Sequence, residues 1–261
     1  MEEKEMLQMI IDTQKEHIAN LNTYIANLEI GKVPMVNQIG DTNWKSADVS
    51  VLRRLLKEHY EGNISIYDYW GIGDERKVDL GGEINQSVEF VLTDREFYKL
   101  ADSEKKCAFT VDQKNLLEDI FLPMNDSNTN EGGWKSCKMR AYVNKVYAEA
   151  IPESFLSLFK QFVIDDDGNP IVDTFTLRSE VEIFGDHMFS RKEENGRQIE
   201  YYKATRNRIK CIGCDSGSAY YWWERSPYYS DSRCFCRVNT SGSANNYLAG
   251  SNRLIAPAGC I

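Results

Sequence analysis

The chain has 261 residues, of which 42% are hydrophobic, enough apolar material for one large domain or two modest ones. Its net charge of −9 argues against a general nucleic-acid binder, which is usually basic. No apolar run approaches the ~18 residues that a membrane span needs. The acidic N-terminus lacks the pattern of a secretory signal peptide. We therefore expect no nucleic-acid partner, no membrane insertion and no signal peptide.

The charge is unevenly distributed along the chain. Residues 201–261 contain eight Lys and Arg against three Asp and Glu, a net charge of +5, so residues 1–200 carry −14. After Lys210 every cation is arginine, whose planar guanidinium both stacks and forms hydrogen bonds. This composition is typical of a segment that contacts a partner.

The first 30 residues carry a heptad pattern, with residues of the seam spaced alternately four and three apart. The pattern predicts a coiled-coil oligomerisation helix over residues 1–30, as a dimer or a trimer. An amphipathic helix packed on its own domain is the alternative, which the strict 3.5-residue period disfavours. The seam residues are Leu7, Ile11, Gln14, Ile18, Leu21, Ile25 and Leu28.

The middle of the chain alternates helical and strand patterns. A linker and a helix are expected over residues 31–63, and a single domain over residues 64–261. The mixture of elements predicts an α+β fold. Helices are expected over residues 48–60, 114–121, 138–149 and 152–162, a strand–turn–strand unit over 64–80 and a strand over 88–92.

An acidic run, Asp165-Asp166-Asp167-Gly168, lies between two apolar segments. As a calcium loop it would have its glycine two positions too early, and Thr176 would replace the bidentate glutamate of an EF-hand. An Asp-Gly hairpin turn explains the run better.

Seven cysteines and three histidines are the candidates for metal or redox chemistry. The odd cysteine count leaves at least one thiol free or paired between chains. Cys211-x-x-Cys214 and Cys234-x-Cys236 suggest zinc, but the second pair has one intervening residue where zinc sites usually have two or more, and the histidines are scattered. Nucleophile elbows and phosphate-binding loops are absent from the sequence. We therefore expect no metal, no cofactor and no enzyme activity.

Residues 215–261 have the composition of a binding surface. They contain eight Ser, five Tyr, four Asn and four Gly, and no Lys. Tyrosine offers rigid contact area at low entropic cost, while Ser and Asn offer adaptable hydrogen bonds, as in antibody paratopes. An exposed, turn-rich β region without a binding role would have a similar composition. Strands are predicted over 220–227, 234–238 and 254–261, in a small antiparallel sheet with exposed loops.

Several short motifs carry a resemblance to a known family. The most specific is Trp222-Trp223-Glu224-Arg225-Ser226-Pro227, followed at the chain end by Ala256-Pro257-Ala258-Gly259-Cys260-Ile261. With matching pieces at 69–74, 132–136, 179–185 and 200–203, residues 64–261 resemble an uncharacterised domain family of gut-bacterial prophages. That family has a C-type-lectin-like fold of the formylglycine-generating-enzyme type.

The resemblance implies a C-type-lectin-like domain, an irregular antiparallel sheet with flanking helices. This broader fold includes the variable receptor-binding proteins of diversity-generating retroelements, in which adenine-directed mutagenesis substitutes residues of a C-terminal region. The composition of residues 218–253 is similar to that of such a variable region. The resemblance thus implies a phage tail-fibre tip or adhesin, in the virion or in the cytoplasm before assembly. Its partner would be a protein or glycan receptor on a bacterial cell surface.

The predicted contact face lies within the C-terminal segment. Tyr and Phe would anchor the ligand, Arg would pair with acidic or carbonyl groups, and Asn would form specific polar contacts. Trp222, Trp223, Arg225 and Pro257 are assigned to the scaffold instead. The contact residues are Tyr220, Tyr228, Tyr229, Asp231, Arg233, Phe235, Arg237, Asn239, Asn245, Asn246, Tyr247, Asn252 and Arg253.

Two other functions stay open at this stage. One is a thiol-dependent oxidising enzyme of the same fold, which would use Cys211 with Cys214 or Cys234 with Cys236. The other is a purely structural virion protein, whose C-terminal loops would tolerate substitution without any effect on host attachment.

Overall fold

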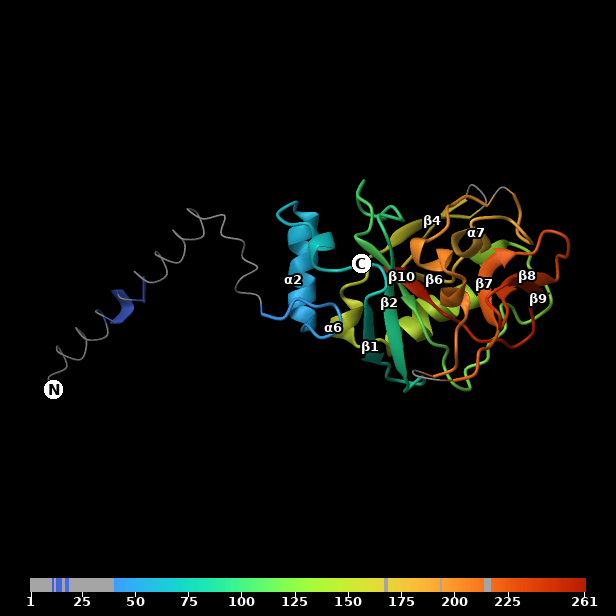
Figure 1. Cartoon of the computed structure of the whole chain (residues 1–261), viewed down its shortest axis with the longest axis horizontal. Coiled ribbons are helices and arrows are strands. Elements are labelled where there is room, and N and C mark those ends of the chain that lie inside the picture. The colour runs from blue at the N-terminus through green and yellow to red at the C-terminus, as the bar shows by residue number, and fades with distance from the viewer. Residues whose placement is uncertain are drawn as a thin grey trace. The chain divides into compact units, whose positions relative to one another are not determined.

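A computed structural model of the chain describes residues 11, 13–15, 17–18, 40–166, 169–192, 194–213 and 217–261 (Figure 1). The chain divides into two units, Met1–Gly40 and Asp41–Ile261. In the first unit Ile11, Gln14 and Ile18 are helical and exposed. The other seam residues of the predicted coiled coil lie outside the described residues, so the coiled coil stays a prediction. These residues are Leu7, Leu21, Ile25 and Leu28.

The second unit has an α+β fold, as predicted, with short helices and three antiparallel sheets among its described residues. The α-helices are α2 (Val49–Tyr60), α3 (Gly133–Ser136), α4 (Lys138–Tyr142), α5 (Ala148–Ala150), α6 (Glu153–Leu156) and α7 (Glu180–Phe184). A π-helical turn η3 (Val143–Tyr147) joins α4 to α5, and 3-10 turns are η2 (Ile66–Asp68), η4 (Glu200–Lys203) and η5 (Thr205–Arg208). The strands are β1 (Glu75–Asp79), β2 (Ser87–Arg95), β3 (Phe109–Gln113), β4 (Phe162–Asp166), β5 (Asn169–Asp173), β6 (Phe175–Thr176), β7 (Trp222–Pro227), β8 (Cys234–Val238), β9 (Ala244–Leu248) and β10 (Ala258–Cys260).

The central sheet has five strands in the order β1-β2-β3-β10-β6. The last strand of the chain, β10, is inserted between β3 and β6, so the C-terminus lies in the middle of the unit (Figure 1). Gly259 pairs with Val111 on one side and Phe175 on the other. A Cβ atom there would lie 2.7 Å from the Phe159 ring, so the close approach requires glycine.

The two smaller sheets are β4-β5 and β7-β8-β9. In the first, Asp166 pairs with Asn169, which confirms the predicted hairpin, although the turn residues 167–168 lie outside the described residues. In the second, β7 and β8 confirm the predicted strands, and β9 is a strand that the sequence analysis did not predict. The predicted strand over 254–261 is confirmed only as β10, and it belongs to the central sheet instead.

Helix α2 confirms the helix predicted over 48–60. It belongs to the same compact unit as the sheets. Its side chains Leu52, Leu55 and Leu56 are buried, and the Tyr60 hydroxyl donates a hydrogen bond of 2.9 Å to the carbonyl of Ile261. The compact unit accordingly begins at Asp41, before the domain boundary predicted at residue 64.

Several other local predictions are wrong for a common reason. Residues 114–121 are not a helix, because the amide of Leu116 donates to the carbonyl of Cys211 in a long-range pairing. The helix predicted over 152–162 ends with α6, and Phe162 begins strand β4. The first strand predicted within 64–80 is replaced by η2. Tertiary backbone pairing overrides helix and strand propensity at these places.

One face of the central sheet packs on the helices between α3 and α6. Phe90 contacts the rings of Phe155 and Phe159, with centroids 5.5 and 6.0 Å away. The hydroxyl of Tyr147 donates a hydrogen bond of 2.8 Å to Gln113. All five side chains are buried, so this face holds an aromatic core with one satisfied polar pair.

The other face of the central sheet holds a buried ion pair. Arg178, which follows β6, donates to Asp112 of β3 through Nε (2.9 Å) and Nη2 (2.5 Å), and both side chains are wholly buried. Tyr202 and Thr93 donate further hydrogen bonds of 2.6 Å to Asp112. Burial alone would raise the pKa of Asp112, but the charge of Arg178 holds it below its usual value. The carboxylate is therefore charged and fully satisfied.

A second buried ion pair joins α7 to β7. Arg225 donates to the two carboxylate oxygens of Glu182 at 2.7 and 2.6 Å, and to the carbonyl of Leu177 at 2.9 Å. The Tyr98 hydroxyl donates to Glu182 and accepts from Arg178 at 3.2 Å, so it links the two pairs. We call these four charged residues with Tyr98 the buried ion-pair network. Arg225, predicted as part of the scaffold, is 3% exposed, which confirms that assignment.

Replacing Arg225 by leucine should destabilise the protein strongly. The change leaves Glu182 buried without its bidentate partner, and breaking a buried pair in this way costs about 3–5 kcal/mol. Urea denaturation of the two proteins measures the difference in unfolding free energy. The exposed pair Asp231–Arg233 supplies the matched control, because Arg233→Leu should leave the unfolding curve unchanged. Equal curves for wild type and Arg225→Leu would contradict the role of the network.

Lys210 should make stability depend on alkaline pH. It is 2% exposed, and burial lowers its pKa from 10.5 to about 8. Between these values the unfolded chain binds more protons than the folded one, so the contribution of Lys210 to stability rises with pH by up to roughly 3 kcal/mol. Buried tyrosines and thiols titrate nearby, so the measurement is the difference between wild type and Lys210→Met in denaturation curves from pH 7 to pH 11. A difference that does not vary with pH would refute this prediction.

Candidate functional site

The central strand of the C-terminal sheet is covered on both faces, whereas the edge strand β9 is partly exposed. Its central strand β8 places Arg237 opposite Trp223 of β7 and Asn245 of β9. All five residues of β8 are buried. Phe235, predicted to contact a ligand, is wholly buried and is not part of an exposed face. Phe235 was predicted from the composition of its segment, which does not show that both faces of β8 are covered.

Five side chains at one end of this sheet form a contact group that we call the arginine–tyrosine cluster: Tyr221, Arg237, Asn245, Tyr247 and Arg253. The guanidinium of Arg237 lies 4.2 Å from the ring centroids of both Tyr221 and Tyr247. The guanidinium of Arg253 lies 4.2 Å from the same Tyr247 ring. Asn245 accepts a hydrogen bond of 2.9 Å from Nε of Arg237. The rings therefore hold two guanidinium groups in fixed planes by cation–π contact.

The two arginines of the cluster have unsatisfied hydrogen-bonding capacity. Nη1 of Arg237 and Nε of Arg253 are buried and have no hydrogen-bond partner among the described residues. Among the residues that the structure describes, neither guanidinium forms an ion pair with a carboxylate. Burial, with the nearby charge of Arg253, lowers the pKa of Arg237 to about 10. Arg237 is still a cation at neutral pH, and within the described residues it lacks the anionic partner that buried arginine usually has.

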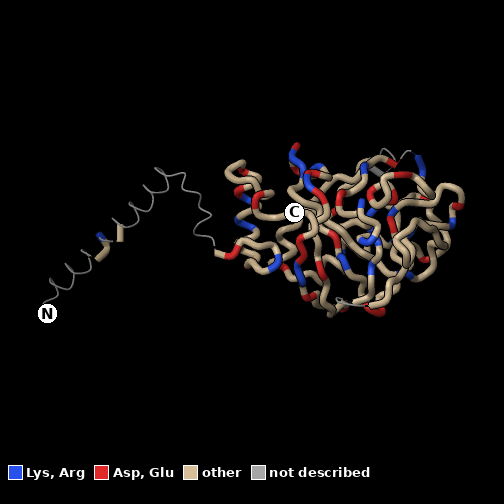
Figure 2. The backbone as a smooth tube through the Cα atoms, viewed as in Figure 1, with Lys and Arg blue, Asp and Glu red and all other residues tan. Residues whose placement is uncertain are grey.

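Most of the other positive charge of residues 201–261 is already engaged inside the unit. Arg225 and Lys210 are buried, and Arg233 and Lys203 pair with neighbouring carboxylates. Figure 2 shows basic and acidic residues interspersed over the unit, with no single basic end. The predicted net charge of +5 therefore does not form one basic surface.

A second group of predicted contact residues lies in the connection between β7 and β8. Tyr229 is 64% exposed, and its ring meets that of Tyr228 edge-on. Arg233 donates to both oxygens of Asp231 at 3.0 and 2.9 Å, and these hydrogen bonds lower the pKa of Asp231 to about 2. Asp231 and Arg233 therefore satisfy each other's charge. Tyr229 is the most exposed aromatic side chain of this group.

The predicted asparagines have different roles. The Asn239 side chain accepts from the amides of Ser241 and Ser243 at 2.9 Å, so it shapes its own turn. Asn246 is half-buried and lies opposite Cys236, on the other face of the sheet from Asn245. Asn252 is exposed, and its carbonyl accepts a hydrogen bond of 2.6 Å from Arg253.

Sequence reasoning missed one member of the cluster. Tyr220 was predicted, and its ring packs at the edge of the neighbouring Tyr221 ring, 5.9 Å away. Tyr221 itself, which stacks on Arg237, was not among the predicted contact residues. Strand alternation was the available signal, because it places Tyr221 on the same face as Trp223, opposite Arg237.

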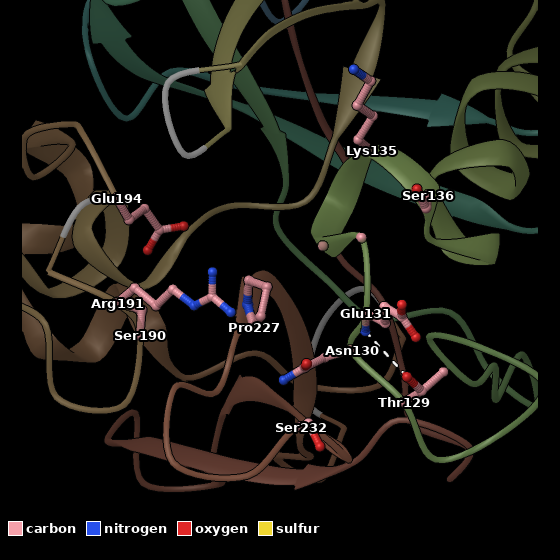
Figure 3. Close-up of a pocket in the computed structure, with 12 residues that line it drawn as sticks. Thr129, Asn130, Glu131, Lys135, Ser136, Ser190, Arg191, Glu194, Pro227 and Ser232 are labelled. Carbon is pink, nitrogen blue, oxygen red and sulfur yellow. Dashed lines mark hydrogen bonds between the residues drawn. The ribbon is translucent and has the colours of Figure 1, made fainter.

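A cavity of about 740 Å³ lies at the other end of β7 (Figure 3). The loop around Asn130, the start of α3, the residues Ser190, Arg191 and Glu194 and the end of β7 form its walls. Glu194 lines it and accepts hydrogen bonds of 2.7 and 2.8 Å from the Ser226 hydroxyl. Burial raises the pKa of Glu194 to about 7. Sequence reasoning had no signal for this cavity, because its walls come from four distant segments.

Of the two cysteine pairs that the alternative enzyme function would use, the structure describes both members only of Cys234 with Cys236. The six described cysteines are all free, and Cys214 lies outside the described residues. Cys234 and Cys236 are both buried on β8. Cys107 and Cys260 share a hydrogen bond that lowers the pKa of the Cys107 thiol, but both are wholly buried. Burial keeps this pair from contact with a substrate in the folded state.

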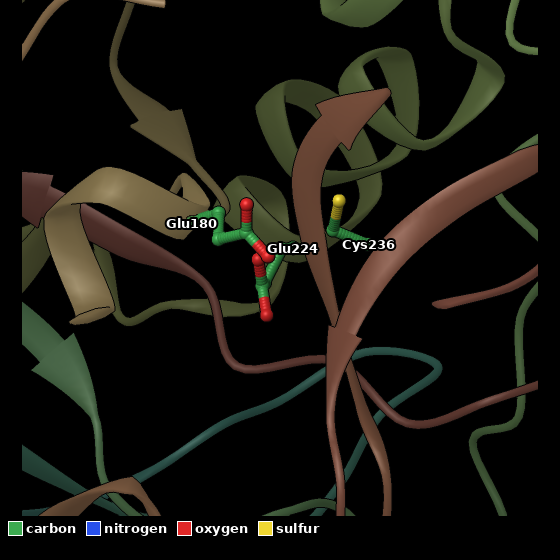
Figure 4. A group of neighbouring side chains, drawn as sticks. All are labelled: Glu180, Glu224 and Cys236. Atoms are coloured by element: carbon green, nitrogen blue, oxygen red, sulfur yellow. The ribbon is translucent and has the colours of Figure 1, made fainter. Parts of the chain in front are cut away.

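One group of described side chains has the spacing of metal ligands. Glu180, Glu224 and Cys236 are buried, and one ligand atom from each lies within 4.8 Å of the others (Figure 4). Sequence analysis predicted no metal, because these residues have no recognisable spacing along the chain.

Comparison with known proteins identifies one family. The family model described as a domain of unknown function, DUF6273, matches residues 112–261. The match covers more than half of the chain, from the middle of β3 to the C-terminus, and includes the arginine–tyrosine cluster and the cavity. Searches of curated proteins and of solved structures gave no match. No described helix is long and apolar enough to cross a membrane. The chain therefore belongs to the DUF6273 family.

Proposed function

We propose that the chain is a non-enzymatic receptor- or ligand-binding protein, of the phage tail-fibre tip or adhesin kind. In this proposal residues 64–261 have a C-type-lectin-like fold, and the ligand contacts the C-terminal sheet. The observation that carries it is the arginine–tyrosine cluster, with two cations that lack an anionic partner within the described residues.

The chemistry of the cluster favours an acidic ligand group. A carboxylate or phosphate beside the half-buried Arg253 would pair with a cation that has no carboxylate partner within the described residues, and charge-assisted hydrogen bonds of this kind are the strong ones. Tyr247 is 38% exposed and offers a ring for contact beside the cations. Because the rings already hold the guanidinium planes, binding would cost little side-chain entropy. Acidic sugars and acidic protein side chains on a bacterial surface both carry such groups.

The division between scaffold and surface also supports the proposal. Trp222, Trp223 and Pro257 are buried, whereas Tyr229, Arg233 and Tyr247 are exposed within the region 218–253. Substitutions at the exposed positions would change the contact surface without loss of the core. Diversification of this region is proposed from the resemblance alone. A near-copy DNA repeat that differs only at adenines, beside a reverse transcriptase gene, would establish it.

Tyr247→Ala and Arg253→Gln should each weaken ligand binding about tenfold or more. Tyrosine and arginine are typical hot-spot residues, and a loss above ~1.4 kcal/mol corresponds to this factor. The measurement is binding of the labelled full-length protein to an array of acidic and neutral bacterial glycans, and to intact cells of a gut-bacterial strain panel.

Lys203→Gln is the matched control, since Lys203 is an exposed cation outside the predicted contact face. Unchanged binding of both cluster variants would refute this contact face, and would favour a purely structural virion protein if all thirteen predicted residues behaved likewise. Loss of binding in cysteine-to-serine variants, but not in the Tyr and Arg variants, would favour the thiol-dependent enzyme.

We further propose that the chain self-associates through residues 7–28 as a dimer or trimer. Ile11 and Ile18 are helical and are 41% and 57% exposed, as expected for a seam without its partner. Linked sites can raise avidity by ~10²–10⁴ where the geometry permits simultaneous contact.

The double substitution Ile11→Asp with Ile18→Asp should convert the oligomer to a monomer, because charged side chains at two seam positions oppose packing of the helices. Light scattering on the full chain measures the mass. Lys15→Asp, at a position between these two in the sequence but not on the seam, is the control. A wild-type chain that is monomeric at all concentrations would contradict the coiled coil.

A further inference from the structure

The carboxylate of Glu224 is the most unusual polar group in the described part of the chain. Glu224 lies in the middle of β7 and is wholly buried, and neither carboxylate oxygen has a hydrogen-bond partner among the described residues. A buried carboxylate without a partner is costly, so such groups are normally neutralised by a proton, a cation or a metal. Burial, followed by the charges of Glu180 and Glu194, raises the pKa of Glu224 well above its usual value.

Two potential metal ligands lie next to this carboxylate. Glu180 is the first residue of α7, and Cys236 is the central residue of β8. Figure 4 shows the side chains of Glu180 and Glu224 facing each other beside the Cys236 thiol, and one ligand atom from each lies within 4.8 Å of the others. Ligands of one tetrahedral zinc ion lie roughly 3.5 Å apart. To bind one ion, each of the three side chains would therefore move by less than about 1 Å.

Glu180 is held in place by its surroundings. Its carboxylate accepts hydrogen bonds from the amides of Met188 (2.9 Å), Phe189 (2.8 and 3.1 Å) and Ser190 (2.7 Å). Its own amide donates to the Ser226 hydroxyl at 2.8 Å. Such outer contacts orient a metal ligand. An oriented carboxylate thus lies beside a buried carboxylate without a hydrogen-bond partner among the described residues, an arrangement that a bound cation would stabilise.

The site is connected to the cavity of Figure 3. Ser190 and Glu194 line that cavity, and they contact Glu180 and Ser226, respectively. Residues that line the cavity therefore lie in direct contact with the cluster. Three protein ligands leave one tetrahedral position, which a water molecule can occupy.

We propose that Glu180, Glu224 and Cys236 bind one Zn²⁺ ion, which ties α7 to strands β7 and β8. The thiol decides the class of metal, because sulfur ligands select zinc over calcium and magnesium, which prefer oxygen. Zinc binding displaces the proton that burial favours on the Glu224 carboxyl and the proton of the Cys236 thiol, and both protons are released to solvent. The site is distinct from the arginine–tyrosine cluster and does not depend on the ligand-binding proposal.

Cobalt and zinc titrations of the full-length protein test the site. After treatment with a chelator, the wild type should bind one equivalent of Co²⁺ with a thiolate-to-cobalt charge-transfer band, and one equivalent of Zn²⁺ should raise its unfolding midpoint. Cys236→Ser should remove the band, and Glu224→Gln should weaken metal binding by ~100-fold, at the upper end of what changes around a metal site cost.

Cys234→Ser and Cys211→Ser are the matched controls, the first on the same strand and the second in the Cys211-x-x-Cys214 pair. Both should keep the band and the stoichiometry of one. Glu224→Gln keeps the shape of the side chain and removes its charge, so circular dichroism should show a native fold. If Cys236→Ser fails to fold, Cys236→Ala gives the same readout.

Two results would overturn the site. The first is a wild type without a cobalt band or a zinc-dependent unfolding midpoint, which would mean that a proton alone neutralises Glu224. The second is a band that persists in Cys236→Ser and disappears in Cys211→Ser, which would place the metal at the other cysteine pair.

Discussion

The buried ion-pair network is the constraint on which the rest of the unit Asp41–Ile261 depends. Asp112 belongs to the central sheet, Glu182 to α7 and Arg225 to the C-terminal sheet, and Arg178 and Tyr98 connect them. Each charge has a bidentate partner, so the network is stable as a whole and costly to break at any one member. Three elements far apart in the sequence are therefore held in one arrangement.

Both candidate sites follow from this arrangement. Anchored at Arg225, strand β7 brings Tyr221 beside Arg237 of β8 at one end, and presents Glu224 to Cys236 and Glu180 further along. The first contact leaves cations without an anion, and the second leaves a carboxylate without a cation. The unpaired polar atoms at these two places contrast with the fully paired buried ion-pair network.

Local patterns were enough to predict some elements. The apolar spacing of α2, the alternation in β8 and the Asp-Gly signal between β4 and β5 each reflect interactions within a few residues. Residues 114–121 and 254–261 were mispredicted because their backbone partners are distant in the sequence. Strand 244–248 was missed although its partner β8 is the preceding strand, because its two asparagines have low strand propensity. The same limit applies to the site. Composition indicated the C-terminal segment, but it could not distinguish buried Phe235 from exposed Tyr229.

The sequence by itself determined the α+β class, the acidic and basic parts of the chain, and the assignment of Trp222, Trp223 and Arg225 to the scaffold. These properties depend on residue type and on short-range periodicity. Only the tertiary structure decided which charges meet: Arg237 with Arg253 around one tyrosine ring, and Glu180 with Glu224 beside a thiol. Such encounters depend on how β10 and β7 are placed in their sheets. Backbone pairing and buried ion pairs set their positions, and these interactions join residues more than 60 positions apart in the sequence. Local sequence patterns do not report such contacts.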